Sequence, residues 1–168
     1  CAYNFMKNNI AFILVDSKGL ASGVSASTTA QISIAHDSLY SEITKKHGED
    51  KAIAYLKSQT EGLNLIKTII NSEKIKCDYQ EESTIIYANE EKNIQVLDDQ
   101  FAIVKNYSKC KLVKQSNNFI NYKKGIQFDN QFIFNPMKYM MGIINILIKN
   151  NIPLYEKSKV TAINKKIN

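Results

Sequence analysis

The pattern of hydrophobic and polar positions separates predicted strands from predicted helices along the chain. Ile10–Val15 is an uninterrupted apolar run, which is typical of a strand buried on both faces of a parallel sheet. Residues 125–134 alternate as an extended strand does, with an interruption near Asp129 and Asn130. The whole pattern predicts helices at 3–7, 38–46, 49–72, 90–105 and 136–149, and strands at 10–15, 83–88, 111–113, 125–134, 152–155 and 159–163.

Two of the predicted helices begin with residues suited to that position. Asp37 can cap the helix at 38–46, which ends near Gly48. Asn135 is a good N-cap, and Pro136 fits the first helical position because the N–H that proline lacks would be unpaired there.

The predicted fold class is α/β, or α+β taken over the whole chain. A buried parallel strand must be joined to its neighbour by a crossover, usually a helix, and residues 3–7 fit the end of such a helix. No strand precedes it, and the chain starts with Cys1 rather than Met, so we expect further sequence upstream. The later strands should form a separate, largely antiparallel sheet covered by amphipathic helices.

Composition and charge narrow the class of protein. At 168 residues and 44% hydrophobic, the chain can bury the core of an ordinary globular domain. The run Ile10–Val15 is too short to span a bilayer and lacks signal-peptide flanks, so we expect no membrane span and a cytoplasmic location. The net charge is +6, but all 22 basic residues are lysines scattered along the chain, which disfavours nucleic acid as a partner.

The cysteines predict neither a disulfide framework nor a zinc site. Cys1, Cys77 and Cys110 are odd in number, widely spaced and without a C-x-x-C pair. We expect free thiols.

The clearest candidate for chemistry is the end of the first strand and the loop that follows. Asp16, directly after the apolar run, stands where a carboxylate can accept hydrogen bonds from a nucleotide ribose. The alternative is that Asp16 only begins a turn. The loop at 17–30 is rich in Gly, Ser and Thr, whose small donors suit a pyrophosphate, although a solvated loop has the same composition.

Together these features resemble a known family. Phe12–Asp16 followed by Gly19, Gly23, Ser25, Ser27, Thr28, Thr29 and Ala30 resembles the second strand and cofactor loop of the D-amino-acid-oxidase-like, glycine-oxidase-like FAD oxidoreductases. The resemblance covers nearly the whole chain and extends to a bacterial subgroup that often carries an added Rieske iron–sulfur domain. It continues through Ala35-His36-Asp37-x-x-Tyr40, Lys46-x-Gly48-Glu49, Cys77-Asp78-Tyr79 and Asn130-Gln131-Phe132-x-Phe134-x-Pro136-x-x-Tyr139.

The resemblance implies FAD as cofactor and assigns residues to it. In that family the acid after the second strand binds the adenosine ribose, and the loop contacts the pyrophosphate and approaches the flavin. The positions that would inherit these roles are Asp16, Ser17, Gly23, Ser25, Ser27, Thr28 and Thr29. Val160 matches the valine whose backbone meets the adenine.

The resemblance also implies a division of the chain. Residues 1–36 would be a partial Rossmann-like FAD-binding segment. Residues 37–150 would hold the helices and sheet of a substrate domain, and 151–168 would begin the return to the FAD-binding domain.

The implied activity is oxidation of an amine or amino acid by hydride transfer to the flavin, with a small-molecule substrate. No arginine is present to clamp a substrate carboxylate, so that clamp must lie elsewhere, or the substrate is not a simple amino acid. Because the upstream glycine turn is absent, we expect this chain alone to bind no FAD and to be inactive. The alternatives are a non-catalytic binding module or degenerate flavoprotein remnant, and a basic nucleic-acid-binding domain.

Four further residues are weaker candidates. His36 follows the cofactor loop and could face the flavin, or it could be a hydrogen-bonded structural histidine. Tyr40, Gln131 and Tyr139 could line a substrate site, although tyrosines on a helix face are more often half-buried packing residues.

Overall fold

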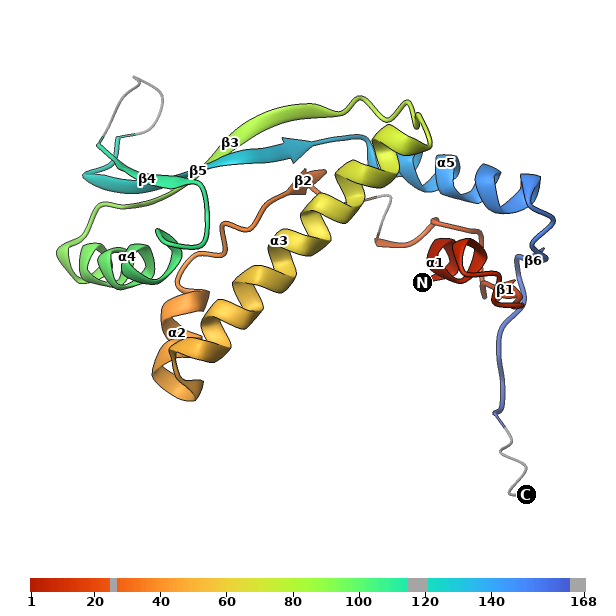
Figure 1. Ribbon diagram of the computed structural model, residues 1–168, viewed down its shortest axis with the longest axis horizontal. Helices are drawn as coiled ribbons and strands as arrows, with labels where there is room; N and C mark the ends of the chain where they lie inside the picture. The colour runs from red at the N-terminus through yellow and green to blue at the C-terminus, as the bar shows by residue number, and fades with distance from the viewer. Residues whose placement is uncertain (25–26, 115–120, 164–168) are drawn as a thin grey trace. The chain divides into compact units, whose positions relative to one another are not determined.

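The computed structural model describes residues 1–24, 27–114 and 121–163, and the chain forms two compact units (Figure 1). The first unit comprises residues 1–30, 74–78 and 135–168, and the second comprises residues 31–73 and 79–134. The mixed α/β class predicted from the sequence is confirmed.

The first unit joins the two ends of the chain through a short parallel ladder. Its elements are α1 (Ala2–Lys7), β1 (Leu14–Val15), α5 (Pro136–Lys149) and β6 (Leu154–Tyr155). Leu14 pairs with Leu154, and Val15 pairs with Tyr155. Helix α5 begins as predicted, because the Asn135 side chain accepts a 3.0 Å hydrogen bond from the Lys138 N–H and Pro136 is the first helical residue.

Two strand predictions in this unit are wrong. The predicted strand 10–15 is reduced to the two residues of β1, and Ile13 is 61% exposed rather than buried. Within the described residues β1 has the single neighbour β6, so no second strand extends its ladder or covers its side chains. Residues 159–163 form no strand, since no described strand pairs with them.

The second unit is an antiparallel sheet with helices packed against it. Its elements are β2 (Gln31–Ile32), α2 (Leu39–His47), α3 (Glu49–Ser72), β3 (Gln80–Ala88), α4 (Glu91–Val104), β4 (Cys110–Val113) and β5 (Lys124–Ile133). Strand β5 is central and pairs with β3 along its whole length, and with β2 and β4 over shorter stretches. The sequence predicted all of these elements except β2, and it placed α3 at the observed residues.

The predicted interruption near Asp129 and Asn130 is a β-bulge. Glu82 pairs with Gln131 and Thr84 pairs with Phe128, so Asp129 and Asn130 stand opposite Ser83 alone. Asn130 adopts a left-handed backbone with φ 61°. The strand bends at this point without ending, because asparagine tolerates that conformation better than most residues.

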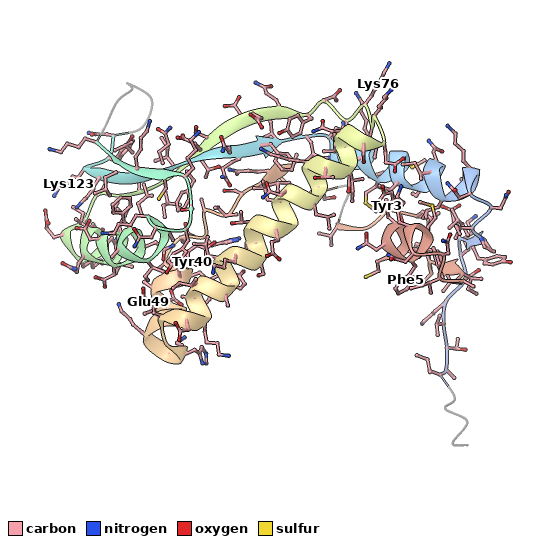
Figure 2. The ribbon with its side chains drawn as sticks, in the orientation of Figure 1. Tyr3, Phe5, Tyr40, Glu49, Lys76 and Lys123 are labelled. Atoms are coloured by element: carbon pink, nitrogen blue, oxygen red, sulfur yellow. The ribbon has the colours of Figure 1, made fainter. Side chains whose placement is uncertain are left out.

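The core of the second unit lies between the sheet and α2, α3 and α4. Tyr40 is fully buried where α2 packs against α3, and its hydroxyl donates a 2.7 Å hydrogen bond to the Ile34 carbonyl (Figure 2). Gln100 is also fully buried: its Oε1 accepts from the Ser41 N–H and its Nε2 donates to the His36 carbonyl. These bonds satisfy backbone groups that would be costly to bury unpaired.

The predicted cap of α2 is wrong by one residue. The N-cap is Ser38 rather than Asp37, and Ser38 makes no side-chain bond to the helix backbone. The Ser38 hydroxyl instead donates to the Glu42 carboxylate, one turn into the helix.

Lys67 connects α3 to the bulged end of the sheet. Its Nζ lies 2.8 Å from Glu81 Oε1 and donates a 3.1 Å bond to the Asn130 carbonyl, and its side chain is only 17% exposed. The hydrogen bond from Lys67 holds the pKa of Glu81 below its ordinary value, with a second contribution from the Tyr79 hydroxyl.

We expect Lys67→Met to lower the free energy of unfolding at neutral pH. The difference in this free energy between wild type and variant should be smaller in acid. A carboxyl with a lowered folded pKa stabilises the fold above its unfolded pKa, about 4.3, and loses that contribution as the pH falls further. Urea denaturation of the complete wild-type and variant proteins at pH 7 and near pH 3 measures this difference at each pH. The control Lys123→Met removes a pair whose side chains are 60% and 82% exposed, and should change little. If Lys67→Met lowered the free energy of unfolding by the same amount at both pH values, the prediction would be contradicted.

Candidate cofactor site

Asp16 follows β1 directly, and the backbone of its neighbours fixes it there. The Asp16 N–H donates a 2.9 Å bond to the Tyr155 carbonyl, and the Asp16 carbonyl accepts a 2.8 Å bond from the Ser158 N–H. These bonds continue the β1–β6 pairing beyond the two residues of each strand. The candidate site is therefore built at the carboxyl ends of two parallel strands, where α/β proteins bind ligands.

The Asp16 carboxylate shapes a turn with one oxygen and leaves the other available. Oδ1 accepts a 2.7 Å bond from the Lys18 N–H, which is an Asx-turn. Among the described residues, Oδ2 has no hydrogen-bond partner. Asp16 as a residue is half-exposed, and a carboxylate oxygen without a partner can accept a hydrogen bond from a hydroxyl group of a ligand.

The next turn, residues 19–22, is held by its own serine and by a distant carboxylate. The Ser22 N–H and hydroxyl both donate to the Gly19 carbonyl, at 3.1 and 2.7 Å. The Leu20 N–H donates a 2.8 Å bond to Glu156 Oε1. In parallel, the Lys157 N–H donates a 2.7 Å bond to the Lys18 carbonyl.

The predicted loop residues that follow are open to solvent. The exposed ones are Ser17, Gly23, Ser27, Thr28 and Thr29, and Ser25 lies outside the described residues. Most of their hydroxyls make no bond to other described residues, while Thr28 Oγ1 accepts a long 3.5 Å bond from the Ala30 N–H. Exposed hydroxyls and backbone amides beside a carboxylate fit the groups of a dinucleotide, namely phosphate oxygens and ribose hydroxyls.

Val160 lies two residues beyond the Ser158 N–H that bonds to Asp16, and its side chain is 58% exposed. The structure therefore brings Asp16 and residues 156–158 together across the sequence. Glu156 is the participant that sequence reasoning missed. An isolated acid after a short predicted strand carries no motif, and its partner Leu20 lies 136 residues away.

The four weaker candidates belong mainly to the packing. Tyr40 and Gln131 are buried, and both bond to the backbone of Ile34, which gives each side chain a structural partner within the second unit. Burial, with a smaller effect of Tyr55, raises the pKa of Tyr40 well above its ordinary value. Tyr139 is half-buried on α5, where burial also raises the pKa of its hydroxyl.

His36 packs against two tyrosines. Its ring centroid lies 6.0 Å from those of Tyr40 and Tyr55, and its Nε2 is buried with no hydrogen-bond partner among the residues that the structure describes. The alternative of a hydrogen-bonded structural histidine is therefore not supported at this nitrogen.

The described part of the chain contains no group of residues suited to a metal site, no disulfide and no helix able to cross a membrane. Within those residues, no group of three or more His, Cys, Asp or Glu could hold a metal ion. Cys1, Cys77 and Cys110 form no disulfide within the described residues. No described helix is both long and apolar enough to cross a membrane.

A carboxylate at the end of a parallel strand, followed by a hydroxyl-rich loop, is the arrangement of a nucleotide-binding α/β protein. The family model described as FAD dependent oxidoreductase (DAO) matches residues 1–168. The chain belongs to this family.

One curated relative is similar over almost the whole chain. It is the Bacillus subtilis (strain 168) protein named "Putative Rieske 2Fe-2S iron-sulfur protein YhfW", 24% identical over 165 residues. The similarity covers 98% of this chain and 32% of the relative, so the chain spans about a third of that protein's length.

Solved structures share the fold at low sequence identity. The L-amino acid deaminase of Proteus myxofaciens, in complex with anthranilate, has a TM-score of 0.77 and 11% identity over 98% of this chain and 37% of its own. The glycine oxidase of Bacillus cereus ATCC 14579 has a TM-score of 0.65 and 11% identity, and the match covers 98% of this chain and 44% of the oxidase. The L-alpha-glycerophosphate oxidase of Mycoplasma pneumoniae, with FAD bound, has a TM-score of 0.67 and 15% identity. The match covers 99% of this chain and 43% of the oxidase.

Proposed function

We propose that the protein containing this chain is an FAD-dependent oxidoreductase that oxidises an amine or amino acid by hydride transfer to the flavin. The observation that carries the proposal is the Asp16 carboxylate at the end of β1, with one oxygen held in a turn and the other available to a ligand. The family match supports FAD as the cofactor. The bound flavin supplies the hydride acceptor.

The residues of this chain would hold the adenosine half of the cofactor. Asp16 Oδ2 would accept a hydrogen bond from a ribose hydroxyl, and the backbone near Val160 would face the adenine. The loop would donate to the pyrophosphate through Ser17, Gly23, Ser27, Thr28 and Thr29. The amine-bearing carbon of the substrate would give a hydride to the bound flavin, and loss of a proton from the nitrogen would leave an imine. The residues of this chain would bind and orient the cofactor.

The substrate class is part of the proposal. Two solved relatives are named for amino acids or glycine, and a third for glycerophosphate. The absence of arginine from these 168 residues means that no guanidinium of this chain clamps a substrate carboxylate. A small-molecule amine or amino acid remains the proposed substrate, and nucleic acid is not proposed as a partner.

The test is to purify the complete protein, record its visible spectrum, and identify the nucleotide released on denaturation. We expect stoichiometric FAD. Anaerobic mixing with panels of amino acids, amines and glycerol phosphate should then bleach the flavin with an amino compound. A protein that stays colourless after reconstitution with FAD would disprove the cofactor, and bleaching by glycerol phosphate alone would disprove the substrate class.

A further inference from the structure

Glu156 lies far from the cofactor loop in sequence and beside its first turn in the structure. Resting on the proposed function, we infer that Glu156 is a positioning residue for FAD: its carboxylate anchors the turn at residues 19–22 and so sets how the following loop meets the pyrophosphate. Glu156 would act through the loop, without touching the cofactor.

The backbone around Glu156 is fixed on both sides. Strand β6 ends immediately before it, at Tyr155, whose carbonyl accepts from the Asp16 N–H. Immediately after it, the Lys157 and Ser158 N–H groups bond to the carbonyls of Lys18 and Asp16, at 2.7 and 2.8 Å. The Ser158 hydroxyl also donates a 2.9 Å bond to the Glu156 carbonyl. The side chain of Glu156 therefore starts from a well-defined position.

The turn that Glu156 reaches needs an external partner. Ala21 adopts a left-handed backbone with φ 61°, which is unfavourable for a residue with a Cβ and persists only where the surroundings hold it. The bonds between Ser22 and Gly19 close the turn but do not attach it to the rest of the unit. The 2.8 Å bond from the Leu20 N–H to Glu156 Oε1 makes that attachment.

Leu20 also lines a groove that includes Glu156. Leu20 and Glu156 line one groove together with Ile144 and Ile148 of α5 and Leu154 of β6. The Leu20 amide is thus bonded to a carboxylate, and Leu20 lines the same groove as these apolar residues. Gly23 follows three residues later, so the anchor lies where the chain enters the exposed loop.

The test compares Glu156→Ala with Glu156→Gln in the complete protein. The glutamine carbonyl can still accept from the Leu20 N–H, whereas alanine leaves that amide without a partner. The control is Asp78→Asn, which removes a carboxylate of the same unit that pairs with Lys138 instead of the loop. The measurements are hydrogen exchange at the Leu20 amide in the FAD-free protein and the dissociation constant for FAD.

We expect Glu156→Ala to speed exchange at Leu20 and to raise the FAD dissociation constant on the order of tenfold. Glu156→Gln should stay near wild type in both measurements, as should Asp78→Asn. Unchanged FAD affinity in Glu156→Ala, or an equal loss in Glu156→Ala and Glu156→Gln, would overturn the inference. If the wild-type protein binds no FAD, the proposed function fails, and unchanged exchange at Leu20 in Glu156→Ala would separately show that the anchor does not exist.

Discussion

Replacing Asp16 with alanine should weaken FAD binding by roughly 1.5–3 kcal/mol, which is about ten- to a hundredfold in the dissociation constant. The change removes a charge-assisted acceptor for the ribose and also the acceptor of the Lys18 N–H in the Asx-turn. Titration of the FAD-free protein, followed by flavin fluorescence, gives the dissociation constant.

A second variant at the same position separates the two roles. Asp16→Asn retains a carbonyl oxygen for the Lys18 N–H but replaces the available carboxylate oxygen with an NH₂ donor. We expect Asp16→Asn to lose nearly as much affinity as Asp16→Ala. Wild-type affinity in Asp16→Asn, with a loss only in Asp16→Ala, would show that Asp16 is a turn residue and does not bind the ribose.

Replacing Phe128 with alanine should destabilise the second unit by about 3–5 kcal/mol. Phe128 is fully buried on the central strand β5, where its Cα partners are Thr84 on β3 and Cys110 on β4. The substitution removes apolar surface from the core and leaves a cavity that the paired strands cannot collapse to fill. Denaturant unfolding of the complete protein, followed by far-UV circular dichroism, measures the loss.

The matched control is Leu112→Ala, on the neighbouring strand β4. Leu112 is 42% exposed, so its truncation should cost about 1 kcal/mol or less. Equal losses in the two variants would show that the sheet is not the core of this unit.

The sequence by itself determined the elements whose residues interact locally. Helix α3 appears at its predicted residues, 49–72, because apolar side chains at helical spacing give one continuous buried face. Asn135 and Pro136 determine the start of α5 through a cap bond that spans three residues. The ordered series of motifs also indicated the family to which the chain belongs.

Only the tertiary structure decided what depends on partners far away in the sequence. An apolar run such as Ile10–Val15 can pair as a strand only where a neighbouring strand lies beside it, and β6 reaches just two of its residues. Gln131 likewise depends on a distant partner, because its side-chain oxygen accepts a hydrogen bond from the Ile34 N–H. The sequence motif around Gln131 does not predict this bond. The bond between Leu20 and Glu156 joins residues 136 positions apart, and neither residue carries a local pattern that predicts it. Hydrogen bonds and burial between such distant segments are fixed by how the chain folds back on itself, which the local periodicity does not specify.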